Sequence, residues 1–182
     1  MLEQFQAYFQ RIITHIPWWH WVIMGVVSLG IAVTLLIRKK RGVYGAIVLG
    51  LTVFVGLFLL DTAVVARYLG SFPHDSGYGF TLGFERLLKG SRTALVEFIA
   101  NIAVFVPFGL FLSESLSEGR RLRFWKQIGI VCLVAFGLSL CIEMLQLILH
   151  VGFFEVKDLV TNTFGAFIGA VVALAVRRFF RK

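Results

Sequence analysis

Five apolar runs dominate the pattern of hydrophobic and polar positions along this chain. They cover approximately residues 18–37, 43–66, 94–113, 127–150 and 159–176. At a rise of roughly 1.5 Å per residue, a helix over each run is long enough to cross a hydrocarbon core of roughly 30 Å. The pattern therefore predicts an all-α membrane protein, in which a five-helix transmembrane bundle forms a single domain over residues 1–182.

The segment before the first run, residues 1–17, has a different pattern. Its apolar positions recur at alternating steps of three and four, which is typical of an apolar stripe on one side of a helix. These positions are Leu2, Phe5, Phe9, Ile12 and Ile16. Because three tryptophans follow within the next five residues, we expect an N-terminal interfacial amphipathic helix that leads into the first span.

Residues 67–93 form the longest connection between apolar runs. Their first half is rich in Gly, Pro and Ser, a composition typical of turns. Their second half interleaves apolar with charged residues, so part of it is expected to lie amphipathically on the membrane surface.

Composition agrees with a membrane protein, since 58% of the residues are hydrophobic and only 15% are charged. The formal net charge of +8 would suit a nucleic-acid partner. However, the basic residues form short clusters beside apolar runs, as membrane anchors do, so we expect membrane lipids as partners and no nucleic acid.

Three basic clusters predict the orientation of the bundle. They contain 12 of the 18 basic residues, and with five spans they all fall on the same side of the membrane. Their members are Arg38, Lys39, Lys40 and Arg41; Arg120, Arg121, Arg123 and Lys126; and Arg177, Arg178, Arg181 and Lys182. Because cytoplasmic loops are enriched in Lys and Arg, this side is expected to face the cytoplasm. The N-terminus is then outside and the C-terminus inside.

Acidic and amide residues share the outer half of three spans. Ionisable groups inside a membrane are costly, so they are candidates for function. The sets are Glu97 with Asn101 in the third span, Glu143 with Gln146 in the fourth, and Asp158 with Asn162 in the fifth. Steps of three or four residues place each set on one helix face, directed toward the bundle interior or a wet cavity. Asp61 of the second span is expected to join them.

Structural roles also account for most of these residues. Asp158 and Glu97 are expected near helix starts, where an acid caps the helix or complements its dipole. The amides would equally serve as hydrogen bonds between helices. His150, at the end of the fourth span, is typical of an interfacial residue and is a weak candidate for a metal ligand. Glu143 lies some two turns inside its span, so capping does not explain it.

Small residues predict how the last spans pack. Gly165 and Gly169 form a GxxxG pattern that Thr161 precedes at the same step, which favours a close approach between helices. Pro107 and Gly109 are expected to kink or loosen the third span.

Three blocks resemble the VanZ-like family of bacterial membrane proteins over roughly residues 94–176. They are Asn101-Ile-Ala-Val-Phe-Val-Pro107-Phe-Gly109, Glu143-Met-Leu-Gln146 and Asp158-Leu-Val-Thr-Asn162-Thr-Phe-Gly165 with Gly169. The resemblance implies a multi-pass protein of the bacterial cytoplasmic membrane and a link to low-level teicoplanin resistance. The family pattern has an Arg and a further acid shortly before the last Asp. Gly152 and Lys157 occupy those places here, so Arg86 or Arg92 is expected to replace the arginine.

The leading hypothesis is an outward-facing protein that binds an amphiphilic cell-envelope molecule, a cell-wall precursor or a lipoglycopeptide antibiotic. Its predicted ligand-binding residues are Asp61, Arg92, Glu97, Asn101, Glu143, Gln146, Asp158 and Asn162. An alternative is a membrane enzyme acting on a lipid-linked or cell-wall substrate, with Glu143 and Asp158 as acid and base, or with these carboxylates and a histidine on a metal. A third is a small transporter or accessory subunit, which would suit a homo-oligomer. No cofactor is expected.

Overall fold

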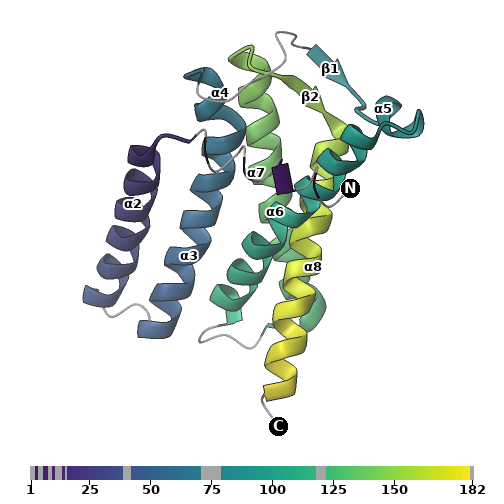
Figure 1. The fold of residues 1–182 in the computed structure, drawn as a ribbon. Helices are drawn as coiled ribbons and strands as arrows, with labels where there is room; N and C mark the ends of the chain where they lie inside the picture. The colour runs from purple at the N-terminus through teal and green to yellow at the C-terminus, as the bar shows by residue number, and fades with distance from the viewer. Residues whose placement is uncertain are drawn as a thin grey trace.

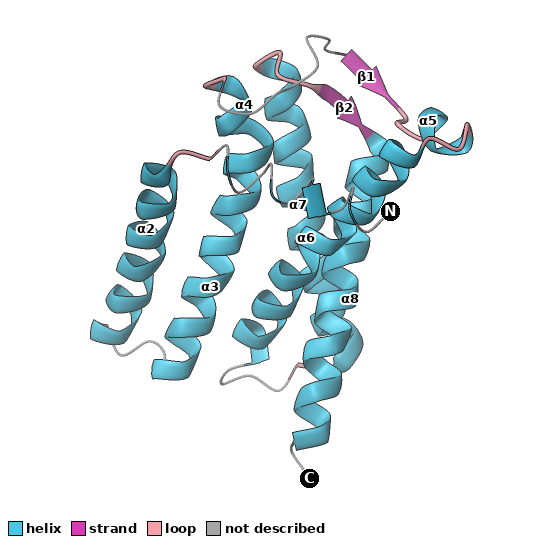
Figure 2. Ribbon diagram, viewed as in Figure 1, coloured by secondary structure: helices cyan, strands magenta, loops and turns pink. Residues whose placement is uncertain are grey.

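The computed structural model describes residues 16–38, 42–70, 79–117 and 122–180, together with five separate positions before residue 16. Helices make up most of it (Figures 1 and 2). They are α2 (Trp18–Ile37), α3 (Val43–Leu60), the π-helix η1 (Asp61–Val65), α4 (Ala66–Tyr68), α5 (Glu85–Leu88), α6 (Arg92–Ser117), α7 (Phe124–Ile148) and α8 (Val156–Phe180). The strands are β1 (Gly79–Thr81) and β2 (Phe153–Glu155).

Five helical segments in the described residues are long and apolar enough to cross a membrane, which confirms the predicted fold class. The second of them runs continuously through α3, η1 and α4, Val43–Tyr68. The last three helices extend a few residues beyond the predicted bounds at most of their ends. Hydropathy marks only the apolar part of a span, whereas a helix continues into the interface wherever its backbone hydrogen bonds continue.

The predicted N-terminal helix falls mostly outside the described residues. The positions described there, Glu3, Gln6, Ala7, Gln10 and Thr14, are helical. Of the predicted apolar stripe, only Ile16 is described, and it is buried. The interfacial helix therefore stays a prediction.

A short parallel sheet, which the sequence pattern did not predict, joins β1 to β2. Gly79 pairs with Phe153, Phe80 with Phe154 and Thr81 with Glu155. The rings of Phe80 and Phe154 stack with their centroids 5.1 Å apart. The sheet thus ties the long connection after α4 to the turn between α7 and α8.

The two ends of the bundle differ in character. At one end, here named the sheet end, the β-strands lie beside the first turns of α6 and α8 and the last turn of α7 (Figure 1). The opposite end, here named the basic end, holds the described members of the three basic clusters, which are Arg38, Arg123, Lys126, Arg177 and Arg178.

Helices α6 and α8 are in direct backbone contact. A Cβ atom added at Gly169 would lie 2.1 Å from the Val106 carbonyl oxygen, and one at Gly165 would lie 2.2 Å from the Ile102 oxygen. From the other side, a Cβ at Gly109 would lie 2.1 Å from the Ala166 oxygen. The close approach predicted from the glycine pattern is present, and α6 continues through Pro107 as one helix.

Candidate functional site

A cavity of about 80 Å³ lies between the second span, α6, α7 and α8, toward the sheet end. Half of the residues that line it are apolar. Its polar lining residues are Thr62, Arg67, Asn101, Glu143, Gln146, Asp158 and Asn162. Five of the eight predicted ligand-binding residues therefore line one cavity.

The directions of the helices explain why residues from α6, α7 and α8 line the same cavity. Helix α6 starts at the sheet end, α7 ends there and α8 starts there again (Figure 1). Asn101 therefore lies in the third turn of α6, Glu143 and Gln146 in the last two turns of α7, and Asp158 in the first turn of α8. Because helical side chains three or four apart share a face, each set can turn to the same interior point.

Glu143 is almost completely buried, with 1% of its surface exposed. Its Oε2 accepts a 2.7 Å hydrogen bond from the backbone N–H of Glu155 in β2. A buried carboxylate needs such donors, because an unpaired charge in an apolar interior is costly. Glu143 thus fixes strand β2 to α7 while it also faces the cavity.

The two amides combine packing with cavity lining. The Gln146 side chain donates a 3.0 Å hydrogen bond to the carbonyl oxygen of Ala63, inside the π-helix. The Asn162 side chain donates a 2.9 Å hydrogen bond to the hydroxyl of Ser139 on α7. Both therefore act between helices, the structural role weighed for them above, and both also shape the cavity wall.

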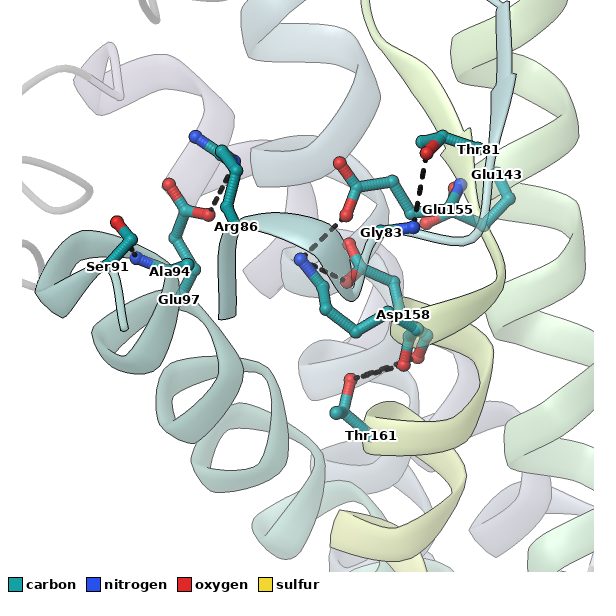
Figure 3. A network of polar contacts seen from close by, with 11 residues as sticks. Thr81, Gly83, Arg86, Ser91, Ala94, Glu97, Glu143, Glu155, Asp158 and Thr161 are labelled. Atoms are coloured by element: carbon teal, nitrogen blue, oxygen red, sulfur yellow. Dashed lines mark hydrogen bonds and ion pairs between the residues drawn. The ribbon is translucent and has the colours of Figure 1, made fainter. Parts of the chain in front are cut away.

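Lys157 forms a buried charge cluster with the two acids beside it. Its Nζ lies 2.6 Å from Glu155 Oε2 and 3.4 Å from Asp158 Oδ1, while the residue is only 2% exposed. The Lys157 backbone N–H also donates to the Leu82 carbonyl oxygen over 3.1 Å. Asp158 is therefore both ion-paired and a cavity residue, and as a first-turn acid it complements the dipole of α8. Figure 3 shows Glu143, Glu155 and Asp158 close together at the start of α8.

The loop after β1 packs directly on this cluster. Gly83 has a positive φ of 77°, and a Cβ there would lie 2.6 Å from Glu155 Oε2. We expect Gly83→Ala to separate Glu155 from Lys157 and to lower the unfolding temperature of the purified protein clearly. Gly90→Ala is the matched control, because Gly90 has a similar φ of 74° and no atom within 4 Å of the added Cβ. Equal losses in both variants would mean that backbone strain alone is responsible.

Arg67 is a cavity residue that the sequence analysis missed. Its Nη1 would lie only 3.3 Å from a Cβ at position 152, so Gly152 leaves space for the guanidinium. Arg86 instead forms a 2.8 Å ion pair with Glu97, and Arg92 does not line the cavity. The expectation of Arg86 or Arg92 at the site is therefore wrong for the cavity, and Arg67 is the arginine among its lining residues. The sequence did contain a signal for Arg67, because this basic residue directly follows the apolar run that contains Asp61, six positions after it.

Asp61, Glu97 and His150 do not line the cavity either. Asp61 forms a 2.6 Å hydrogen bond with His20 of α2, and both residues are buried. Glu97 is held by Arg86, and His150 occupies the turn after α7 with a φ of 57°. Within the described part of the chain, no group of three His, Cys, Asp or Glu side chains is placed to hold a metal ion.

The cavity has mixed charge and small size. Arg67 faces it together with two carboxylates, so both a cationic and an anionic group would find a partner there. Cavities that enclose drug-sized ligands measure roughly 300–1,000 Å³. At about 80 Å³, this one accommodates a few waters or one small polar group.

Comparison with known proteins identifies the family of the chain. A sequence model of the VanZ/LLP1 family matches residues 63–177, which is more than half of the chain and includes every residue of the cavity wall except Phe58, Leu59 and Thr62. Protein VanZ of Enterococcus faecium is 37% identical over 75 residues, a match that covers 40% of this chain and 41% of that protein. No solved structure matches the chain. The five apolar helices and these matches identify a multi-pass membrane protein that belongs to the VanZ/LLP1 family.

Proposed function

We propose that this chain is a VanZ-like resistance protein whose cavity binds one polar group of an amphiphilic cell-envelope molecule or lipoglycopeptide. The observation that carries the proposal is the convergence of Arg67, Asn101, Glu143 and Asp158 from four spans on one cavity. Ionisable residues inside a membrane bundle are costly and commonly mark a binding site or a pathway. The family relationship supplies the link to resistance.

The size of the cavity restricts what binds there. A whole lipoglycopeptide is far too large, so only a charged or hydrogen-bonding terminus of the molecule enters. Its remaining parts rest on the sheet end, where Phe80, Leu82 and Leu88 are exposed, and its acyl chain lies in the bilayer. This division of contacts suits an amphiphile that approaches from the membrane surface.

The proposal requires the sheet end to face outward. The support is the clustering of basic residues at the other end, which is expected to be cytoplasmic. A membrane-impermeant thiol reagent is expected to label Leu82→Cys in intact cells and to label Lys126→Cys only after the cells are opened. The reverse pattern would contradict the orientation.

Direct binding tests the proposal. Protein reconstituted in nanodiscs is titrated with teicoplanin and, separately, with a lipid-linked cell-wall precursor. We expect Asp158→Asn and Arg67→Gln to weaken binding at least about tenfold, since a hydrogen bond to a charged group contributes roughly 1.5–3 kcal/mol. Glu97→Gln is the control, because it removes an ion pair outside the cavity. Equal affinities in all four proteins would contradict a binding role for the cavity.

A membrane enzyme is the second candidate, and one observation favours it. Glu143 and Asp158 face the same cavity but have different partners, a backbone N–H for Glu143 and Lys157 for Asp158. Two carboxylates in distinct environments are the usual basis of acid and base assignment. A new product in lipid extracts of cells expressing the wild type, absent with Glu143→Gln, would favour this candidate over simple binding.

A further inference from the structure

A second hollow lies at the basic end, far along the spans from the polar cavity. It is an open groove of about 430 Å³ where the start of α3 meets the later turns of α6 and α8. Its lining residues are Tyr44, Leu110, Glu114, Val172, Ala173, Val176, Arg177 and Phe180. We propose that this groove binds one anionic phospholipid, with an acyl chain along its apolar wall and the phosphate at Arg177.

The wall of the groove suits an acyl chain. Leu110, Val172, Ala173 and Val176 belong to segments that are long and apolar enough to span a membrane. Val172 and Val176 are exposed in the protein, so the groove opens sideways from α8. In a bilayer such a surface is covered by lipid tails, which are as apolar as the side chains themselves.

The end of the groove suits a phosphate. Arg177 Nη2 donates a 3.1 Å hydrogen bond to the Ser117 carbonyl oxygen, and Nη1 lies 3.8 Å from Glu114 Oε2. The Tyr44 hydroxyl donates to the same Glu114 oxygen over 3.0 Å. These contacts orient the arginine at the membrane surface. A guanidinium carries five N–H donors in a planar fork, so donors remain for the oxygens of a phosphate.

Charge complementarity selects an anionic lipid over a zwitterionic one. The described charged residues in the terminal turns and caps at the basic end are Arg38, Arg123, Lys126, Arg177 and Arg178, against the single acid Glu114. Basic groups between or beside spans attract anionic headgroups, and the attraction decays within a Debye length. The site is separate from the polar cavity, so it does not depend on the function proposed above.

Native mass spectrometry of the full-length protein, released from detergent micelles, tests the proposal. Phosphatidylglycerol is expected to bind about fivefold or more tightly than phosphatidylcholine of the same chain length. Arg177→Gln is expected to abolish this preference, and Arg177→Lys to retain most of it. Val176→Trp fills the groove, so it is expected to reduce binding of both lipids at this site.

Two controls alter similar residues outside the groove. Arg123→Gln removes a charge at the same end, and Val134→Trp enlarges an exposed residue of α7. Arg123 does not line the groove, so Arg123→Gln is expected to keep most of the preference for phosphatidylglycerol, while Val134→Trp is expected to bind both lipids as the wild type does. Equal affinity for the two lipids would overturn the proposal, as would wild-type binding by both Arg177→Gln and Val176→Trp, or an equal loss in Arg177→Lys and Arg177→Gln. Unfolding temperatures of all variants verify that each is folded.

Discussion

Gly169→Ala is expected to destabilise the protein by roughly 3 kcal/mol, the upper part of the usual range for overpacking. The added Cβ would lie 2.1 Å from the Val106 carbonyl oxygen and 2.7 Å from the Leu110 backbone nitrogen. Both contacts are with backbone, so no rotamer change relieves them and α6 must move away from α8. Because Asn101 and Asp158 lie on these two helices, the shift also disturbs the cavity.

Gly137→Ala is the matched control for this substitution. Gly137 is also inside a long helix, but a Cβ there has no atom within 4 Å. Its variant is expected to be unchanged or stabilised by up to about 1 kcal/mol, the helix propensity difference between Gly and Ala. Thermal unfolding in detergent measures both variants. Equal stability of the two would contradict the direct backbone contact between α6 and α8.

His20→Ala or Asp61→Ala is expected to cost about 3 kcal/mol, the upper part of the range for leaving a buried hydrogen-bonding group without its partner. The His20 Nδ1 and Asp61 Oδ1 atoms lie 2.6 Å apart, and the residues are only 3% and 7% exposed. Either substitution leaves the other group buried without this partner. The pair joins α2 to the start of the π-helix, so its loss is expected to loosen the first span.

A double substitution tests whether His20 and Asp61 stabilise the protein through their contact with each other. His20→Ala with Asp61→Ala removes both polar groups and is expected to cost much less than the two single losses combined. Ser28→Ala serves as a control on the same helix, because Ser28 bonds only to Met24 of its own turn in the described contacts. Denaturant unfolding of all variants gives the coupling energy. Additive losses would contradict a direct interaction between His20 and Asp61.

Local patterns in the sequence predicted much of this architecture. A run of apolar residues identifies a span without knowledge of its neighbours, because the bilayer is the same solvent for each helix. Gly165 and Gly169 share a helix face because residues four positions apart in a helix lie on the same side. The alternating direction of the spans and the helical spacing also predicted that Asn101, Glu143 and Asp158 lie at the same end of the bundle and face its interior.

Features that depend on distant partners could not be predicted in this way. Strand β1 pairs with β2, which follows it by more than 70 residues, and three residues each are too few for a period-two pattern. Arg67 reaches the cavity because Gly152 leaves space, a relation invisible in the local sequence. Asp61 and Glu97 lie toward the same end of their spans as the cavity residues do. However, Asp61 pairs with the imidazole of His20 and Glu97 with the guanidinium of Arg86, both outside the cavity.

Glu143 shows how a structural and a functional role meet in one residue. The sequence offered no structural explanation for it, and the structure supplies one in the hydrogen bond from the Glu155 backbone. Glutamine at this position keeps an oxygen acceptor for that bond and removes the ionisable group. Asparagine at position 158 likewise keeps the shape of aspartate without an ionisable group. These two substitutions therefore separate the carboxyl chemistry of the cavity from its structure.

Teicoplanin susceptibility of cells that express these variants is the most direct test of the cavity's proposed role. Wild type, Glu143→Gln, Asp158→Asn and the control Glu97→Gln are compared at matched abundance in the membrane. We predict protection by the wild type and by Glu97→Gln, and susceptibility equal to that of cells without the protein for the two cavity variants. Full protection by both Glu143→Gln and Asp158→Asn would contradict the central claim.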